Sequence, residues 1–198
     1  LLLSVCYMQD CPEGYEWIHE IPSNNYGDEP ISTYNCFYQN DINILREIVG
    51  INDSLMHEPI NIGYQSWVNG RIILLDLGYS NIDSIPNNIG NLNNLEWFGL
   101  HSNNLSHIPE SIGNLNYLEK LWLWDNQLTT IPDNICNNNC LSFPPLPRST
   151  CDFAFSGNKI CPPYPECITA QELGYQDTTE CIGGYGCSDE MACNYNEN

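Results

Sequence analysis

A twelve-residue phrase occurs three times in this 198-residue chain at a constant spacing. The copies occupy residues 75–86, 98–109 and 121–132, and each ends in Ile-Pro. Equivalent positions are 23 residues apart, as Leu77, Leu100 and Leu123 show. A fixed period of this size is typical of a solenoid, in which each unit buries its apolar edge only against its neighbours. The repeat therefore constrains the fold more than any other feature.

The positions that share this period predict the core. Leu-x-Leu alternates as in a half-buried strand, and Ile-Pro ends the strand because proline has no N–H to donate. Asn103 and Asn126, with Ser80 at the same place in the first copy, have side chains that can bond backbone groups of adjacent coils. We expect these residues to be buried: Leu75, Leu77, Ile82, Ile85, Ile89, Leu92, Leu95, Phe98, Leu100, Leu105, Ile108, Ile112, Leu115, Leu118, Leu121, Leu123, Leu128 and Ile131.

The three copies resemble leucine-rich repeats of the L-x-x-L-x-L-x-x-N-x-L-x-x-I-P type. The resemblance implies an α/β solenoid with a parallel, concave sheet. Phe153-Ala-Phe155-Ser-Gly-Asn158 fits the pattern as a fourth coil, reached after an insertion within residues 137–150. We therefore expect a short array of about four coils over residues 71–167, with a C-terminal cap at its end.

Residues 9–70 lack the repeat phase and are expected to form an N-terminal cap. Trp67-Val-Asn-Gly-Arg71 and the residues after it resemble the W-x-G-R-V-x-x-L-x-L entry of capped extracellular leucine-rich repeats. Apolar side chains at helical spacing predict a helix at about 41–49. Cys11 and Cys36 are expected to pair and to stabilise this cap, whose function is to cover the open apolar end of the first coil.

Cysteine content and charge limit the class of protein. Eleven cysteines in a chain of this length indicate an oxidising compartment, so we expect a secreted or cell-surface protein. A net charge of −20 argues against a nucleic-acid partner, because there is no basic face to meet phosphates. No apolar run approaches the roughly 20 residues of a membrane-spanning helix.

Both ends carry further signals. Residues 1–8 are typical of the end of a signal peptide, whose cleavage would remove Cys6. A second interpretation is a bacterial lipobox at Leu3–Cys6, although Val5 stands where a small residue is expected. Residues 168–198 are expected to be a Cys-rich tail. Within it, Gly186-Cys-Ser-Asp-Glu-Met-Ala-Cys193-Asn-Tyr resembles the G-C-[TS]-D-x-x-A-C-N-Y repeat of long secreted or surface proteins of bacteria. We expect a segment of a longer multidomain chain; the alternative is an ordinary Cys-rich tail.

Three further disulfides are expected in the C-terminal half: Cys140–Cys151, Cys136–Cys167 and Cys161–Cys181. Adjacent coils stack at about 4.7–4.9 Å, and Cys167 corresponds to the position next to Cys136 in the coil beneath. A disulfide needs Cα atoms roughly 4.4–6.8 Å apart, so these two lie within range if the fourth coil is in register. The competing arrangement joins Cys136 to Cys161, which requires the chain to cross the width of the coil.

Signals for catalysis or metal binding are absent from the sequence. Four histidines are scattered without H-x-x-x-H spacing, and the cysteines form no paired C-x-x-C motifs. Nothing like G-x-S-x-G places a nucleophile on a sharp turn. We therefore expect no catalytic residues, no metal site and no cofactor, and a binding or structural role rather than an enzyme.

The concave face is the informative surface. Side chains alternate along a strand, so residues between the buried positions point outward in rows across the sheet. The candidate ligand-binding residues in these rows are Tyr79, Trp97, His101, Lys120, Trp122, Trp124 and Asp125. Tryptophan supplies large, rigid contact area with a polar group, which favours a protein or glycan ligand.

Three alternatives to ligand binding remain open for these aromatic residues. The cap or the insertion covers the rings, or the rings pack on each other. The third is that the repeats are a structural spacer or adhesin segment of a larger surface protein, with no ligand of their own.

Overall fold

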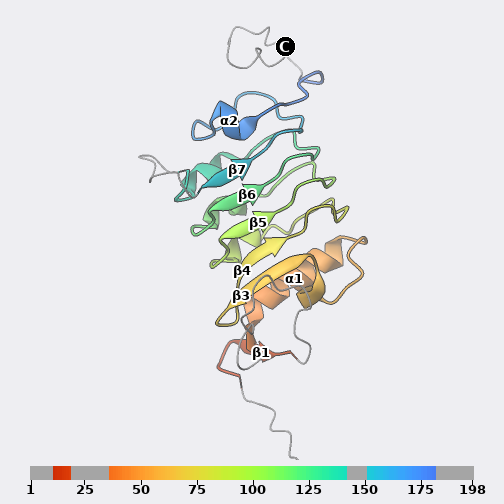
Figure 1. Ribbon diagram of the computed structural model, residues 1–198, viewed down its shortest axis with the longest axis vertical. Coiled ribbons are helices and arrows are strands. Elements are labelled where there is room, and N and C mark those ends of the chain that lie inside the picture. Colours follow the sequence, from red (N-terminus) through yellow and green to blue (C-terminus); the bar gives the residue numbers. More distant parts are fainter. Residues whose placement is uncertain (1–10, 19–35, 142–150, 182–198) are drawn as a thin grey trace, which may run out of the picture.

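The computed structural model describes residues 11–18, 36–141 and 151–181 (Figure 1). Three expectations fall outside these residues: the signal peptide at 1–8, most of the insertion (142–150), and the bacterial-type repeat in the tail. The described chain forms an elongated stack, in which successive coils follow one another along the long axis of the molecule. This is the solenoid-like arrangement that the 23-residue period predicts.

One sheet of five strands runs along the stack. Its strands, in spatial order, are β3 (Tyr64–Val68), β4 (Arg71–Asp76), β5 (Trp97–Gly99), β6 (Lys120–Trp122) and β7 (Asp152–Ala154). Strands β4 to β7 are parallel, whereas β3 pairs with β4 as an antiparallel hairpin. The register places Leu75, Phe98, Leu121 and Phe153 side by side. Equivalent repeat positions are therefore neighbours in space, and the insertion before β7 does not change the register.

The core lies behind this sheet, and every residue predicted from the repeat to be buried is buried. Each coil returns through a short 3-10 helix: η2 (Ile89–Asn91), η3 (Glu110–Asn114) and η4 (Asp133–Asn137). Two glycines allow these helices to approach closely. A Cβ added to Gly90 would lie 2.1 Å from the carbonyl oxygen of Ser111, and one added to Gly113 would lie 1.9 Å from that of Asn134. The spacing between coils therefore depends on glycine at this position of the repeat.

Buried asparagine side chains form a ladder of amides, one in each successive coil, just after the strands of the sheet. Asn103 donates to the carbonyl oxygens of Leu77 and Leu100, both at 2.9 Å. Asn126 and Asn158 repeat these contacts in the next two coils, each bonding one carbonyl of its own coil and one of the coil beneath. The amides satisfy backbone groups that the short strands leave unpaired, as the sequence pattern predicted.

The N-terminal segment packs a helix against the first coil. Strands β1 (Tyr15–Trp17) and β2 (Cys36–Tyr38) are antiparallel. The Cys11–Cys36 disulfide joins the segment before β1 to the first residue of β2. Helix α1 spans Gln39–Ile51, two residues longer at each end than the predicted 41–49. It continues to Ile51 because the side chain of Asn52 bonds the carbonyl oxygen of Ile48 and closes the last turn. A single-turn 3-10 helix, η1 (Pro59–Asn61), leads into β3.

A buried ion pair holds this segment to the sheet. Asp41 in α1 is fully buried and accepts hydrogen bonds from the guanidinium of Arg71 at 2.9 and 3.2 Å and from the backbone N–H of Ile72 at 3.1 Å. Desolvation is the largest single effect and disfavours the charged guanidinium, but the hydrogen bond to Asp41 and the charge interactions together outweigh it, so the pKa of Arg71 is raised. The sequence analysis did not anticipate this contact, because its partners lie 30 residues apart.

The stack continues beyond the point where the tail was expected to begin. Helix α2 (Ala170–Leu173) and the residues after it lie on the fourth coil. The backbone N–H of Phe155 donates to Glu172, and that of Gly157 donates to Tyr175. Gln176 takes the place of the ladder asparagine: it donates to the carbonyl oxygens of Phe155 and Leu173 and accepts from the backbone of Ile160. The boundary expected at 167/168 is therefore displaced, and residues up to Asp177 contact the solenoid.

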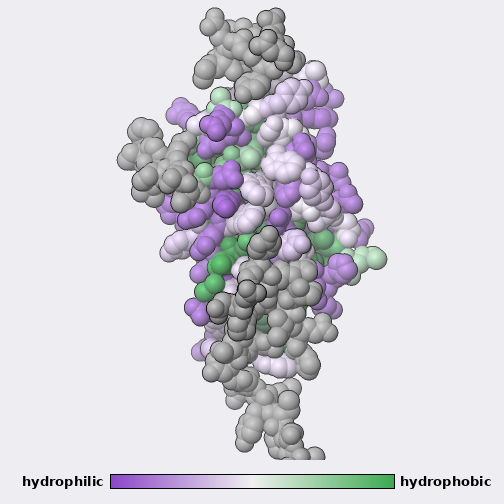
Figure 2. All heavy atoms as spheres, viewed as in Figure 1, coloured by the Kyte–Doolittle hydropathy of each residue, from purple (hydrophilic) through white to green (hydrophobic). Residues whose placement is uncertain are grey.

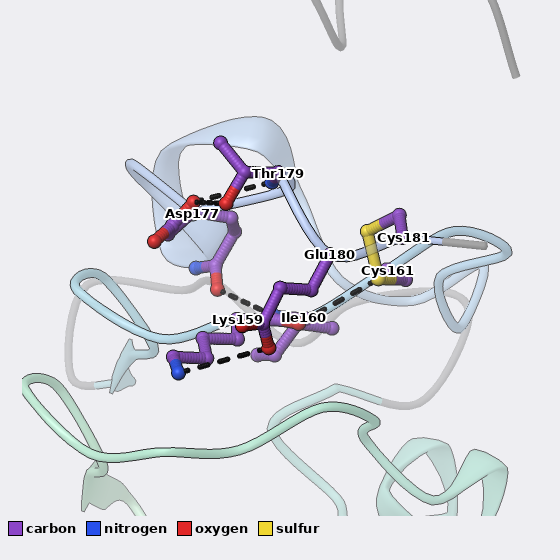
Figure 3. The surroundings of a disulfide bond; sticks show 8 residues. Lys159, Ile160, Cys161, Asp177, Thr179, Glu180 and Cys181 are labelled. Atoms are coloured by element: carbon purple, nitrogen blue, oxygen red, sulfur yellow. Dashed lines mark hydrogen bonds and ion pairs between the residues drawn. A yellow bond between two sulfur atoms is a disulfide. The ribbon is translucent and has the colours of Figure 1, made fainter. Parts of the chain in front are cut away.

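Disulfides tie these last turns together. They join Cys136 to Cys167, Cys140 to Cys151 and Cys161 to Cys181. The Cα atoms of Cys136 and Cys167 are 5.6 Å apart, so the stacked coils place them within bridging distance. Figure 3 shows the Cys161–Cys181 bond beside the salt bridge from Lys159 to Glu180 and the hydrogen bonds between Asp177 and Thr179. The competing Cys136–Cys161 arrangement is not the one present.

Candidate functional site: the aromatic concave face

Parallel strands bring the candidate aromatic side chains onto one surface of the sheet. Trp97 lies beside Lys120 in the register of β5 and β6, and Gly99 lies beside Trp122. The backbone bonds continue this register past the strand ends, since Tyr79 N–H donates to the carbonyl of His101 at 3.1 Å. We call Tyr79, Trp97, His101, Trp122 and Trp124 together the aromatic face.

One half of the aromatic face is centred on Trp122. Its ring packs edge-to-face against Trp97, with centroids 4.9 Å apart and an interplanar angle of 68°. The ammonium of Lys120 lies over the ring of Trp97, 4.8 Å from its centroid. The indole N–H of Trp122 donates to a carboxylate oxygen of Asp152 at 2.8 Å. Both tryptophans are therefore fixed by a charged neighbour, which limits their rotamers.

The other half is centred on His101. The rings of His101 and Trp124 stack at 4.4 Å and 22°, and Tyr79 meets His101 edge-on at 5.2 Å. His101 also contacts Trp122 at 5.8 Å, which joins the two halves into one array. The rings therefore pack on each other, as one alternative from the sequence supposed. His101 is only 8% exposed, so it offers a ligand little more than a ring edge.

Ring packing leaves part of the aromatic face open. Tyr79 is 72% exposed, and Trp97, Trp122 and Trp124 are half-buried. Tyr79 and Asp125 lie in the left-handed region, with φ of 56° and 54°, just after the strands of their coils. This conformation is uncommon for residues other than glycine, and here it turns the chain at the margin of the sheet. Asp125 is exposed at this margin, whereas Lys120 is partly covered by its contact with Trp97.

The structure adds residues that the sequence analysis left out of the site. Asp76 and Asp152 flank the aromatic face, and Tyr64 lies directly opposite Asp76 in the β3–β4 register. Tyr64 was missed because its segment was expected to be a cap outside the repeats. The alternation of exposed Tyr64 with buried Gln65 and Trp67 was the available signal for a strand.

One hollow borders the aromatic face, and a second lies away from it. One of about 440 Å³ lies at the end of the aromatic face and is lined by Gly63, Tyr64, Asp76, Gly78, Tyr79 and His101. A larger one, of about 1000 Å³, lies away from the aromatic face, beside η4 and the Cys136–Cys167 disulfide. It includes Tyr164, whose hydroxyl has its pKa raised by burial. In the space-filling view most of the described surface is hydrophilic to intermediate, and hydrophobic residues form small patches (Figure 2).

Metal and membrane signals were sought in the same part of the chain. Across residues 11–18, 36–141 and 151–181, no three His, Cys, Asp or Glu side chains are placed to hold a metal ion. None of the helices in these ranges has the length and apolar character needed to cross a bilayer.

Comparison with known proteins identifies the repeat. Residues 94–115 and 117–138 match the family model described as Leucine Rich Repeat. This part of the chain is made of leucine-rich repeats. No curated protein matches the chain.

Two solved structures are similar to part of this chain. One is a leucine-rich repeat protein of Leptospira interrogans, 20% identical, with a TM-score of 0.33; the match covers 54% of this chain and 29% of that chain. The other is the BIR3–SERK2 complex from Arabidopsis thaliana, 20% identical, with a TM-score of 0.36; the match covers 57% of this chain and 72% of that chain. The chain thus spans under a third of the Leptospira protein.

Proposed function

We propose that this leucine-rich repeat chain is an extracellular binding module that recognises a protein or glycan ligand through its aromatic face. The observation that carries the proposal is the continuous array of rings from Tyr79 to Trp97, which is contributed by three coils and remains partly open to solvent. Aromatic side chains of this kind supply much of the binding energy in protein interfaces. The proposed role is recognition rather than catalysis.

The arrangement of the rings supports binding by preorganisation. Trp122 is fixed by Trp97 on one side and by its hydrogen bond to Asp152 on the other. A side chain that is already immobile loses little conformational entropy when a ligand covers it. Mutual packing of the rings is thus compatible with a binding surface.

The cysteine chemistry supports an extracellular location. Four disulfides lie within the described residues, and every cysteine described there is bonded. Disulfides of this density persist in oxidising compartments and are rare where thiols are kept reduced.

The alternative function is a structural spacer or adhesin segment without its own ligand. It is favoured by the same ring contacts, since rings that bury each other present less area to a partner. The two functions differ in one consequence: only a binding module loses a ligand when the face is altered.

A binding array tests the proposal. The purified chain is applied to arrays of glycans and of secreted and surface proteins, in parallel with the Trp122→Ala and Trp122→Phe variants. Tyr117→Ala is the matched control, because Tyr117 is an exposed aromatic residue (66%) in the loop before β6, outside the aromatic face. We expect Trp122→Ala to lose the ligand and Tyr117→Ala to retain it, with partial retention for Trp122→Phe. If the unaltered chain binds no ligand on the arrays, the result supports the spacer function instead. The same holds if Tyr117→Ala loses the ligand as completely as Trp122→Ala does.

A further inference from the structure

The hollow of about 440 Å³ at the end of the aromatic face is lined by aromatic side chains that are exposed to solvent. Tyr79 and Tyr64, which are 72% and 54% exposed, lie on its lining. Glycine at position 78 makes room for the His101 ring on this lining, since a Cβ there would lie 2.2 Å from Cε1 and 2.3 Å from Nε2 of His101.

A carboxylate that pairs with no lysine or arginine of the described residues lies on the lining. Asp76 Oδ1 accepts a hydrogen bond from the N–H of Gly78 at 3.0 Å. Glycine at position 99 makes room for this group, since a Cβ there would lie 2.3 Å from the same oxygen. Nδ1 of His101 lies 3.8 Å from the same oxygen, which is too long for a hydrogen bond. That buried nitrogen has no hydrogen-bond partner within the described residues.

The lysine and arginine side chains in the described part of the chain are engaged elsewhere. Arg46 pairs with Glu16, Arg71 with Asp41, and Lys159 with Glu180; Lys120 lies over Trp97. None of these four neutralises Asp76. The carboxylate thus faces a hollow lined by π systems, in a chain with a net charge of −20.

We propose that this hollow binds a lysine or arginine side chain of a basic segment on a partner polypeptide. Asp76 serves as the counter-ion, and the rings of Tyr79 and Tyr64 serve as π faces for the cation. The inference rests on the proposed function and names the ligand class for one end of the same face. A cation near an aromatic face is attracted by the ring quadrupole, and charge-assisted hydrogen bonds to a carboxylate add direction. The negative field of the whole chain attracts a basic partner and repels an acidic one.

Peptide titrations test this inference with two isosteric variants. The probes are tetralysine and tetraarginine, with tetraglutamate and the neutral sugar cellohexaose for comparison, and binding is followed by tryptophan fluorescence. Asp76→Asn removes the charge but keeps an oxygen that accepts from Gly78. Asp83→Asn removes the same charge at an exposed position of the same coil, outside the aromatic face, so the net charge of the two variants is equal. Circular dichroism and thermal unfolding check that both remain folded.

The expected result is a local effect. We expect Asp76→Asn to weaken tetralysine and tetraarginine binding about tenfold, which is the loss of one charge-assisted contact, and Asp83→Asn to weaken it less than about twofold. Tyr79→Asn, which tolerates the left-handed backbone, is expected to weaken it several-fold. Tetraglutamate is expected not to bind.

Three outcomes would overturn the inference. Equal weakening by Asp76→Asn and Asp83→Asn would mean diffuse attraction to an acidic surface. Binding of cellohexaose but of neither basic peptide, lost in Tyr79→Asn, would assign the hollow to a sugar and leave the proposed function standing. If no probe binds and the binding array yields no ligand that depends on Trp122, the proposed function falls as well.

Discussion

The side-chain amide of Asn126 donates to the backbone carbonyl of Leu100, one coil beneath it, at 2.9 Å. The same nitrogen donates to Leu123 in its own coil, while its oxygen accepts from the N–H of Leu105. One buried side chain therefore replaces backbone pairing between two coils, and its loss leaves several buried polar groups without partners.

Replacing this asparagine should be costly. We expect Asn126→Ala to lower the free energy of unfolding by about 2–4 kcal/mol, because buried carbonyls and an N–H lose their partners. Urea unfolding followed by fluorescence measures the change. Gln127→Ala is the control, since the neighbouring side chain is exposed and should alter stability by less than about 0.5 kcal/mol. Similar values for the two variants would contradict the role given to the ladder.

A prediction about the hydrophobic core concerns Leu100, a residue of the second coil that is fully buried. Leu100→Ala should reduce the free energy of unfolding by about 2–5 kcal/mol, the cost of lost burial plus a residual cavity. Calorimetry gives the shift in Tm. The exposed neighbour in the same coil, Asn104, provides the comparison through Asn104→Ala, for which we expect little change.

The Cys136–Cys167 disulfide should stabilise the C-terminal coils. Its cysteines are 31 residues apart, and closing a loop of that size contributes about 3.7 kcal/mol in the chain-entropy account. Cys136→Ser combined with Cys167→Ser should lower Tm and increase proteolysis between residues 151 and 181. Unchanged proteolysis there would mean that the coils are held by packing and the amide ladder alone.

The N-terminal hairpin should respond to acid. A hydrogen bond from Arg46 lowers the pKa of the Glu16 carboxyl below its ordinary value of 4.5. The unfolded state then binds the proton more tightly than the folded state. The contribution of this carboxylate to the free energy of unfolding is therefore present above pH 4.5 and is lost as the pH falls through the folded pKa. Glu16→Gln should reduce stability at pH 7 by less than about 1 kcal/mol, because the pair is exposed. The difference from the unaltered chain should vanish at low pH.

The repeat phase was sufficient to predict most of the fold. Leu77, Leu100 and Leu123 occupy one phase and are all buried, because stacking coils convert sequence period directly into spatial neighbours. The same logic places Cys167 beside Cys136. Local periodicity was also enough to locate α1, although not its last turn, which depends on the side chain of Asn52.

The C-terminal end could not be predicted from the repeat pattern. Gln176 takes the place of asparagine 18 residues after Asn158, so neither the residue type nor the period of 23 marks it. The remaining signal was Leu173-x-x-Gln176, which mirrors Leu123-x-x-Asn126. A coil this short is defined by its contacts with the coil beneath, and those are not visible in sequence.

The candidate site was predictable only in outline. Alternation along the strands gave Trp97 and Trp122 on one face, but not that they contact each other at 4.9 Å. Burial of His101 follows from its stacking on Trp124, which depends on ring orientation rather than on spacing. Tyr64 entered the face through an antiparallel pairing that repeat periodicity does not encode.

Indole NMR tests the central claim most directly. The chain has five tryptophans, and three of them, Trp97, Trp122 and Trp124, lie on the aromatic face, while Trp17 and Trp67 lie in β1 and β3 and belong to no part of it. Each indole N–H gives one signal in a ¹⁵N-labelled sample, assigned by single Trp→Phe variants and followed while the ligand from the binding array is added. We predict that the signals of Trp97, Trp122 and Trp124 shift or broaden while those of Trp17 and Trp67 stay in place. Shifts confined to Trp17 or Trp67, with the other three unmoved at saturation, would contradict recognition through the aromatic face.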